Sequence, residues 1–171
     1  MKIKRSFALF LCSILLFTGC SHESRQEVSK TFFAMDTVMN FSVYGDEKIL
    51  DQTETIISDL ESQMSVTDSG SQIGVLNKNG SVTLTGDTHT LVEKALSLCE
   101  RTNGALDISI YPIVRAWGFT TGKYQVPDDD TISSLLPLVD YKQIQYEPES
   151  DEISLPNDME IDLGSVAKGY A

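Results

Sequence analysis

The chain contains little cysteine, little histidine and few basic residues, and each shortage excludes a class of protein. Its 171 residues include three cysteines and two histidines, and 13 basic residues stand against 25 acidic ones. Three cysteines do not form a disulfide-based scaffold, and the isolated His22 and His89 do not form a zinc site. The formal net charge of -12 argues against a nucleic-acid partner, because phosphate binding requires a basic surface.

Internal repeats, low-complexity tracts and a GxGxxG dinucleotide-binding fingerprint are also absent from the sequence. Hydrophobic residues make up 41% of the chain and charged residues 22%, which is typical of a globular domain. The length suits one ordinary domain or part of one.

The longest apolar run is at the N-terminus. Basic residues within 2–5 precede the run SFALFLCSILLFT at 6–18, and a polar stretch follows Cys20. This order is typical of a secretory signal, and the run is too short to span a membrane as a stable helix. The ending LFTGC at 16–20 resembles a bacterial lipobox, which predicts cleavage before Cys20 and a diacylglycerol group on its thiol. The alternative is an ordinary signal peptide in which Cys20 is incidental.

A lipobox divides the chain into three parts. Residues 1–19 are then the signal peptide, 20–30 a polar tether, and 31–171 the domain. We expect the protein outside the cytoplasm, anchored to a bacterial membrane, because a diacylglycerol group plus an N-acyl chain anchors stably. Cys99 then remains as a lone thiol, so no intramolecular disulfide is expected, and we predict that Cys99 lies in the core.

The first half of the domain is predicted to contain one strand and two amphipathic helices. β-branched and aromatic residues at 31–44 predict a strand. Apolar positions three or four residues apart predict helices at 46–64, with Asp46 as its N-cap, and at 87–102. The segment 65–80 is rich in Ser, Gly, Asn and Asp, which predicts a loop with at most a short helical turn around Ile73–Leu76.

The rest of the chain is predicted to mix short strands with short helices. Three consecutive aspartates, at 128–130, are predicted to begin a helix, because negative charge is favourable at the positive end of the helix dipole. A metal site is disfavoured there, because side chains at adjacent helical positions do not converge on one point. Strands and helices follow without a regular βαβ period, so the predicted fold class is α+β, a mixed sheet with packed helices. Strands are predicted at 81–84, from Gly104 to a break at Pro112, at 142–146 and 152–155, which form a hairpin, and at 159–163. Helices are predicted at 113–117, at 128–137 and from Gly164.

The last segment carries a candidate ligand site. A predicted strand bearing Asp162 runs into a helix whose first turn contains Gly164 and Ser165. Glycine lets a ligand approach the backbone, free N–H groups at a helix start attract phosphate, and Lys168 lies one turn further on, within reach of a diphosphate. Asp162 is suited to bind a ribose, a ring N–H or a metal-bound water. The structural alternative is that Asp162 caps the helix and Lys168 is solvated.

Other positions admit both a functional and a structural explanation. Asp107 stands among apolar residues, where a carboxylate is costly to bury unless it is paired, so it faces a ligand or lies at a strand end. Met35 offers a soft surface for a flat ring, but core packing explains this residue as well. Trp117 is likewise explained either by stacking on a cofactor or by packing in the protein. Ser165 has no nearby histidine and acid to form a nucleophilic triad.

Four sequence blocks, taken in order, resemble the ApbE family, the FAD:protein FMN transferases. They cover nearly all of 31–171, and the last block is the most specific. The blocks are FAMDT at 33–37, then MS at 64–65 with SQI at 71–73 and LN at 76–77, then GALD at 104–107 with PIV at 112–114 and WGF at 117–119, and finally IDLGSVAKGYA at 161–171.

The resemblance implies an enzyme that binds FAD, uses Mg²⁺ and transfers FMN to a Ser or Thr hydroxyl of a target protein, releasing AMP. Some members instead hydrolyse FAD to FMN and AMP. Magnesium would neutralise the diphosphate and polarise the phosphorus under attack. By motif position Ser165 would give the metal an oxygen, and the residues at the FAD site would be Met35, Thr67, Ala105, Leu106, Asp107, Asp162 and Lys168.

Length distinguishes this chain from the family it resembles. Members are much longer than 171 residues, so the chain is expected to be an N-terminal part whose magnesium site is completed by a missing C-terminal half. We expect that residues 20–171 alone neither fold fully nor transfer FMN. Two alternatives stay open, namely a lipid-anchored protein that binds flavin without catalysis, and an inactive truncated copy.

Overall fold

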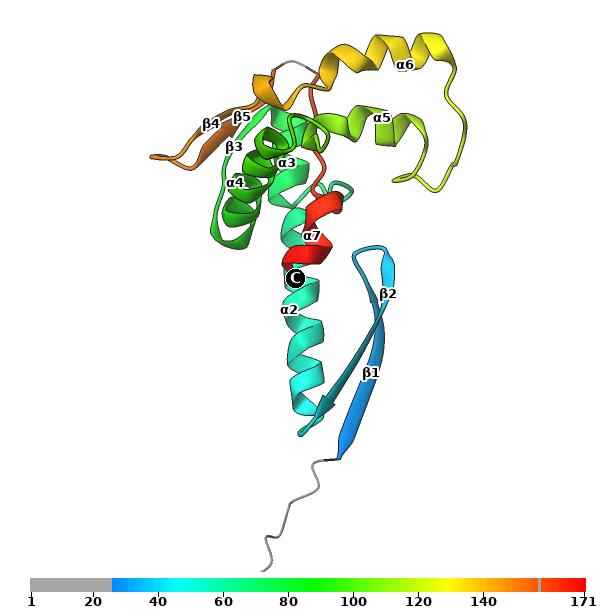
Figure 1. Ribbon diagram of the computed structural model, residues 1–171, viewed down its shortest axis with the longest axis vertical. Coiled ribbons are helices and arrows are strands. Elements are labelled where there is room, and N and C mark those ends of the chain that lie inside the picture. The colour runs from blue at the N-terminus through cyan, green and yellow to red at the C-terminus, as the bar shows by residue number, and fades with distance from the viewer. Residues whose placement is uncertain (1–25, 157) are drawn as a thin grey trace, which may run out of the picture.

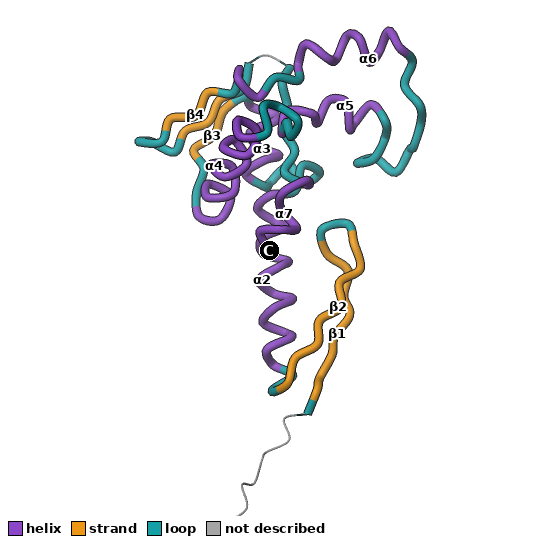
Figure 2. The backbone as a smooth tube through the Cα atoms, in the orientation of Figure 1, coloured by secondary structure: helices purple, strands orange, loops and turns teal. Residues whose placement is uncertain are grey.

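The computed structural model describes residues 26–156 and 158–171. A long helix, α2 (Lys48–Met64), lies beside a β-hairpin, while the other helices and a second small sheet gather toward one end of α2 (Figure 1). Helices and strands combine as an α+β fold, as predicted, although the described strands form two antiparallel sheets rather than one mixed sheet (Figure 2). The predicted signal peptide and Cys20 lie outside the described residues. No helix in the described part is long and apolar enough to cross a membrane.

An N-terminal hairpin replaces the single strand predicted for 31–44. β1 (Glu27–Ala34) pairs with β2 (Thr37–Tyr44) in an antiparallel ladder. The two turn residues, Met35 and Asp36, both have positive φ, of 49° and 58°. Such a two-residue turn follows the twist of the flanking strands. It also continues the alternation of side chains without a glycine, which is why the sequence resembles one uninterrupted strand.

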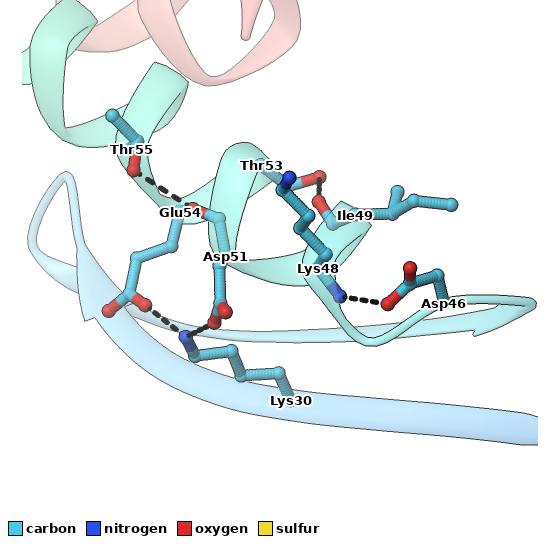
Figure 3. Close-up of polar contacts among 8 residues, drawn as sticks. All are labelled: Lys30, Asp46, Lys48, Ile49, Asp51, Thr53, Glu54 and Thr55. Atoms are coloured by element: carbon cyan, nitrogen blue, oxygen red, sulfur yellow. Dashed lines mark hydrogen bonds and ion pairs between the residues drawn. The ribbon is translucent and has the colours of Figure 1, made fainter.

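Lys30 lies in β1 rather than in the tether predicted for 20–30, because the strand already begins at Glu27. Its ammonium joins the hairpin to α2 (Lys48–Met64), with Nζ 2.6 Å from the Asp51 carboxylate and 2.6 Å from that of Glu54 (Figure 3). The hydrogen bonds to Asp51 and Glu54 raise the pKa of Lys30 above its ordinary value. The Lys30 ammonium therefore stays charged at every physiological pH.

The start of α2 differs from the prediction by two residues. The helix begins at Lys48, and the preceding Glu47 makes no side-chain cap. Asp46 still contributes a cap-like contact, because its Oδ1 accepts a hydrogen bond from the Lys48 backbone N–H at 2.9 Å.

A second sheet and two helices enclose the core. α3 (Gln72–Asn79) leads into β3 (Ser81–Thr83), and α4 (Gly86–Arg101) follows. The sheet has the order β3-β5-β4, with β4 (Gln145–Glu147) and β5 (Glu152–Ser154) forming the predicted hairpin. The most deeply buried side chains come from these elements and from the segment before α7 (Gly164–Tyr170), and include Ile73, Leu76, Val92, Ala95, Cys99, Ile153 and Ile161.

Two predictions for the middle of the chain are wrong. At 65–80, where a loop with at most a short turn around Ile73–Leu76 is predicted, the longer helix α3 forms, because Ser71 caps it by accepting the Gly74 N–H at 2.8 Å. The strand predicted from Gly104 is instead a 3₁₀ turn, Ile108–Ile110. There Asp107 turns the chain by accepting the Ser109 N–H at 2.9 Å.

Short helical segments occupy much of the second half. α5 (Tyr111–Ala116) and α6 (Asp129–Leu135) are joined by an exposed loop, and 3₁₀ turns follow at Leu136–Leu138 and Tyr141–Gln143. The aspartates at 128–130 begin α6, as predicted. The Asp128 carboxylate accepts the Thr131 N–H at 2.6 Å, and this bond lowers the pKa of Asp128.

The end of the chain forms a helix at the predicted place. α7 spans Gly164–Tyr170, and its Tyr170 hydroxyl donates to Asp87 of α4 at 2.7 Å. The segment 159–163 before it buries alternate side chains, but it pairs with no strand among the described residues, and Leu163, with φ of -98° and ψ of 3°, is not extended. The strand predicted there is therefore a segment without regular secondary structure.

Cys99 lies on α4 with 0% exposure, in the core as predicted. Burial raises the pKa of its thiol, so reactive thiolate is scarce near neutral pH. We expect iodoacetamide at about pH 8 to leave Cys99 unmodified in the folded protein and to modify it completely after denaturation, as read by mass spectrometry. Equal labelling rates in the two states would contradict the buried position.

Candidate functional site

A cavity of about 590 Å³ lies among four parts of the chain. They are the turn of the β1–β2 hairpin, the C-terminal end of α2 with the loop after it, the α5–α6 loop, and the start of α7. Its walls combine apolar and aromatic side chains with carboxylates, hydroxyls and a lysine in comparable measure. This composition is typical of a site for a small organic molecule.

The start of α7 forms one wall, where the sequence predicts a ligand site. Asp162, Gly164 and Lys168 all line the cavity. Asp162 Oδ1 accepts the Gly164 N–H at 2.8 Å, while Oδ2 has no hydrogen-bond partner among the described residues. Asp162 therefore supports the first turn of α7 and still offers one carboxylate oxygen to a ligand. Lys168 is exposed on the same wall, so it adds a positive charge there.

The hairpin turn and the end of α2 form a second wall. Met35 in the turn, Met64 at the helix end and Thr67 in the following loop line the cavity. The Thr67 hydroxyl lies 3.0 Å from that of Ser65, which fixes this loop locally. Four residues predicted at the FAD site thus meet at one cavity, namely Met35, Thr67, Asp162 and Lys168.

The other predicted site residues do not line the cavity. Both carboxylate oxygens of Asp107 are bound within the chain, because Oδ1 accepts from Ser109 and Oδ2 accepts the Tyr141 N–H at 3.0 Å. Asp107 thus lies at the start of a 3₁₀ turn rather than at a strand end, and its carboxylate is bound within the chain. Of the remaining three, Leu106 packs against the core, and Ala105 and Ser165 are exposed.

The sequence assigns no role to two aromatic residues of the cavity, Phe119 and Tyr124. Phe119 and Tyr124 line it from the α5–α6 loop, and Trp117 stacks on Phe119 with ring centroids 6.4 Å apart. The chain turns at Gly118, between Trp117 and Phe119, with a φ of 79° that favours glycine. A Cβ at this position would lie 2.0 Å from the Lys123 carbonyl oxygen, so a larger residue would clash. The WGF block at 117–119 is the signal that could have revealed Phe119, whereas no pattern marks Tyr124.

Comparison with known proteins identifies the family. A sequence profile of the ApbE family matches residues 35–171. The chain belongs to the ApbE family. Its curated ApbE relatives carry the name FAD:protein FMN transferase. The protein from Vibrio cholerae is 27% identical over 97% of this chain and 52% of its own length. The protein from Haemophilus influenzae is 26% identical over 99% and 54%.

Solved ApbE structures share the fold. The ApbE protein from Thermotoga maritima superposes with a TM-score of 0.79 at 26% identity, covering 85% of this chain and 50% of its own. The flavin transferase ApbE from Vibrio cholerae superposes with a TM-score of 0.74 at 23% identity, again over 85% of this chain and 50% of its own. The chain therefore spans about half the length of the ApbE relatives that it matches, in agreement with the length difference expected from the resemblance.

Proposed function

We propose that the whole protein to which this chain belongs is an FAD:protein FMN transferase. The observation that carries the proposal is the meeting of Met35, Thr67, Asp162 and Lys168 at one cavity, although the hairpin turn and α7 are far apart in the sequence. Membership of the ApbE family and the names of its relatives support the same activity.

The proposed reaction transfers a phosphoryl-linked flavin. A Ser or Thr hydroxyl of a target protein attacks the phosphorus of the FMN moiety of FAD. As the new P–O bond forms, the bond from that phosphorus to the bridging oxygen breaks, AMP leaves with that oxygen, and the hydroxyl proton passes to solvent or a base. Lys168 is suited to offset the negative charge of the diphosphate. Met35, Phe119 and Tyr124 offer surfaces on which a flavin ring can pack.

The residues that lie outside the cavity enter the proposal in an indirect role. The resemblance assigns Ala105, Leu106 and Asp107 to the FAD site. Asp107 caps the turn that begins at Ile108, and the Ile108 carbonyl accepts the Asp162 N–H at 2.8 Å. We therefore propose that this block shapes the FAD site by holding the segment that carries Asp162.

The described residues do not by themselves form a magnesium site. Among them no group of three His, Cys, Asp or Glu side chains gathers around one point. Ser165, which the resemblance assigns to the metal, is exposed and contributes at most one ligand position. We keep magnesium as a proposed requirement, tested by loss of activity on chelation, and derive no step of the reaction through it.

We also propose that the protein is anchored to a membrane, outside the cytoplasm, through lipid on Cys20. The support is the lipobox-like segment at 16–20 and the position of Glu27, which leaves a short polar segment between Cys20 and the first strand. Replacement of Cys20 by serine is expected to abolish the incorporation of labelled fatty acid into the protein, because the residue that carries the lipid is gone. Equal labelling of Cys20→Ser and the wild type would contradict the anchor.

The activity is tested with protein purified from its source at its native length. The protein is incubated with FAD, Mg²⁺ and extracytoplasmic proteins of the same source, and the products are separated by chromatography. The proposal predicts AMP in solution together with FMN attached to protein. FMN and AMP both in solution would indicate FAD hydrolysis, and FAD bound without cleavage would favour a flavin-binding protein.

A further inference from the structure

We infer that Asn77 is a positioning residue that holds Asp162 in the wall of the cavity. The inference rests on the proposed function, because it concerns how the FAD site of that function is held together. Asn77 lies on α3 and does not line the cavity. It acts on a segment that follows it by 84 residues.

The segment leading to Asp162 needs partners for its backbone from elsewhere in the chain. Residues 159–163 have no regular secondary structure and belong to neither described sheet. Met159, Ile161 and Leu163 have exposures of 3%, 0% and 1%, so this segment runs through the core. An unpaired N–H or C=O group in such a place would be costly.

The carboxamide of Asn77 supplies both missing partners. Its Nδ2 donates to the Ile161 carbonyl at 2.9 Å, and its Oδ1 accepts the Ile161 N–H at 2.8 Å. Asparagine carries a donor and an acceptor on one short planar group, and here that group takes the place of a neighbouring strand. The next residue, Asp162, donates its N–H to Ile108 at 2.8 Å. The backbone of Ile161 and Asp162 is thus held by hydrogen bonds from two elements, α3 and the 3₁₀ turn at Ile108.

Asn77 is suited to this role because α3 is itself fixed. Ser71 caps its start, Gly80 ends it in the left-handed conformation with φ of 78°, and Ile73 and Leu76 are fully buried. The Ser71 hydroxyl also donates to the carbonyl of Ser65, in the loop that carries Thr67. One short helix therefore sets the positions of two cavity walls.

The substitution Asn77→Asp tests the inference with almost no change in shape. The ionised carboxylate can still accept the Ile161 N–H but cannot donate to the Ile161 carbonyl. We expect the dissociation constant for FAD, measured by flavin fluorescence on protein of native length, to rise about tenfold near pH 8. The increase should shrink as the pH falls, because the protonated carboxyl regains an O–H donor.

Two controls separate positioning from general stability. Asn79→Asp places the same charge on an exposed position of the same helix, so FAD affinity should not change. In an Asp162→Ala background, Asn77→Asp should cause no further loss of FAD affinity, because the contact through which it acts is already removed. If Asn77→Asp fails to fold, Asn77→Gln, which keeps both groups on a longer stem, replaces it in the same measurements.

The outcomes distinguish the inference from the proposed function. Absence of FAD binding by the wild-type protein would overturn the proposed function, and the inference with it. If the wild type binds FAD while the Asn77 variants bind equally well, the inference alone is overturned. An equal loss of affinity with and without the Asp162 side chain would also overturn it, because Asn77 would then act only on stability.

Discussion

Replacement of Asp162 by alanine is expected to reduce the rate of FAD cleavage by about 100-fold or more. Asp162 lies on the α7 wall of the cavity, where Oδ1 accepts the Gly164 N–H and Oδ2 remains available to a ligand. Alanine removes the ligand contact and also frees the first turn of α7. The rate is measured as AMP released per enzyme from FAD, using protein of native length.

A matched pair of charge-neutralising variants refines this prediction. Asp162→Asn keeps an oxygen for the Gly164 N–H and loses the charge, so we expect a smaller decrease than with alanine. Asp158→Asn removes a charge four residues earlier, at an exposed position with φ of 65° that asparagine tolerates, and should leave the rate unchanged. Equal rates for the wild type and Asp162→Ala would show that Asp162 takes no part in the site.

Replacement of Gly74 by alanine is expected to lower the free energy of unfolding by about 3 kcal/mol. Gly74 lies in α3, and a Cβ there would lie 2.0 Å from the backbone oxygen of Asp68. That oxygen belongs to the backbone, so relief requires movement of the whole loop between α2 and α3. The same loop carries Thr67, so FAD affinity should fall as well. Chemical denaturation and FAD titration measure the two effects.

Gly169 provides the control for this substitution. It lies in α7, and a Cβ there would have no neighbour within 4 Å, so Gly169→Ala causes no clash. We expect a small stabilisation of about 0.5–1 kcal/mol, because alanine favours the helix over the unfolded chain. Similar free energies of unfolding for the two variants would contradict the close packing of α3 against the Asp68 loop.

The sequence predicts the long elements of this fold well, because their patterns are local. α2 and α4 follow from apolar residues spaced along one face, and α6 follows from the acidic cap at Asp128. The hairpin turn could not be predicted in the same way, because Met35 and Asp36 adopt left-handed conformations and the sequence there contains no glycine or other clear turn signal. The 3₁₀ turn at Ile108 depends on hydrogen bonds from Asp107 to Ser109 and to Tyr141. Tyr141 lies 34 residues later in the chain, so a local sequence pattern cannot predict the second bond.

The candidate site was predictable to the extent that its residues lie in recognisable blocks. Asp162 and Lys168 come from a strand-to-helix motif with a physical meaning of its own, and Met35 and Thr67 come from the family resemblance. Tyr124 carries no local signal, because its place at the cavity depends on the path of the α5–α6 loop. Asn77 is part of the LN block, yet its contact with Ile161 appears only when residues 84 apart in the sequence are brought together.

The most direct test of the proposed activity is a search for flavin covalently bound to protein. Extracytoplasmic and membrane proteins are prepared from the source with and without the gene for this protein, and tryptic peptides are analysed by mass spectrometry. The proposed function predicts a Ser or Thr residue bearing FMN as a phosphoester, present only when the gene is intact and restored by the wild-type gene but not by Asp162→Ala. The same FMN-bearing peptides in both preparations, or none in either, would contradict it.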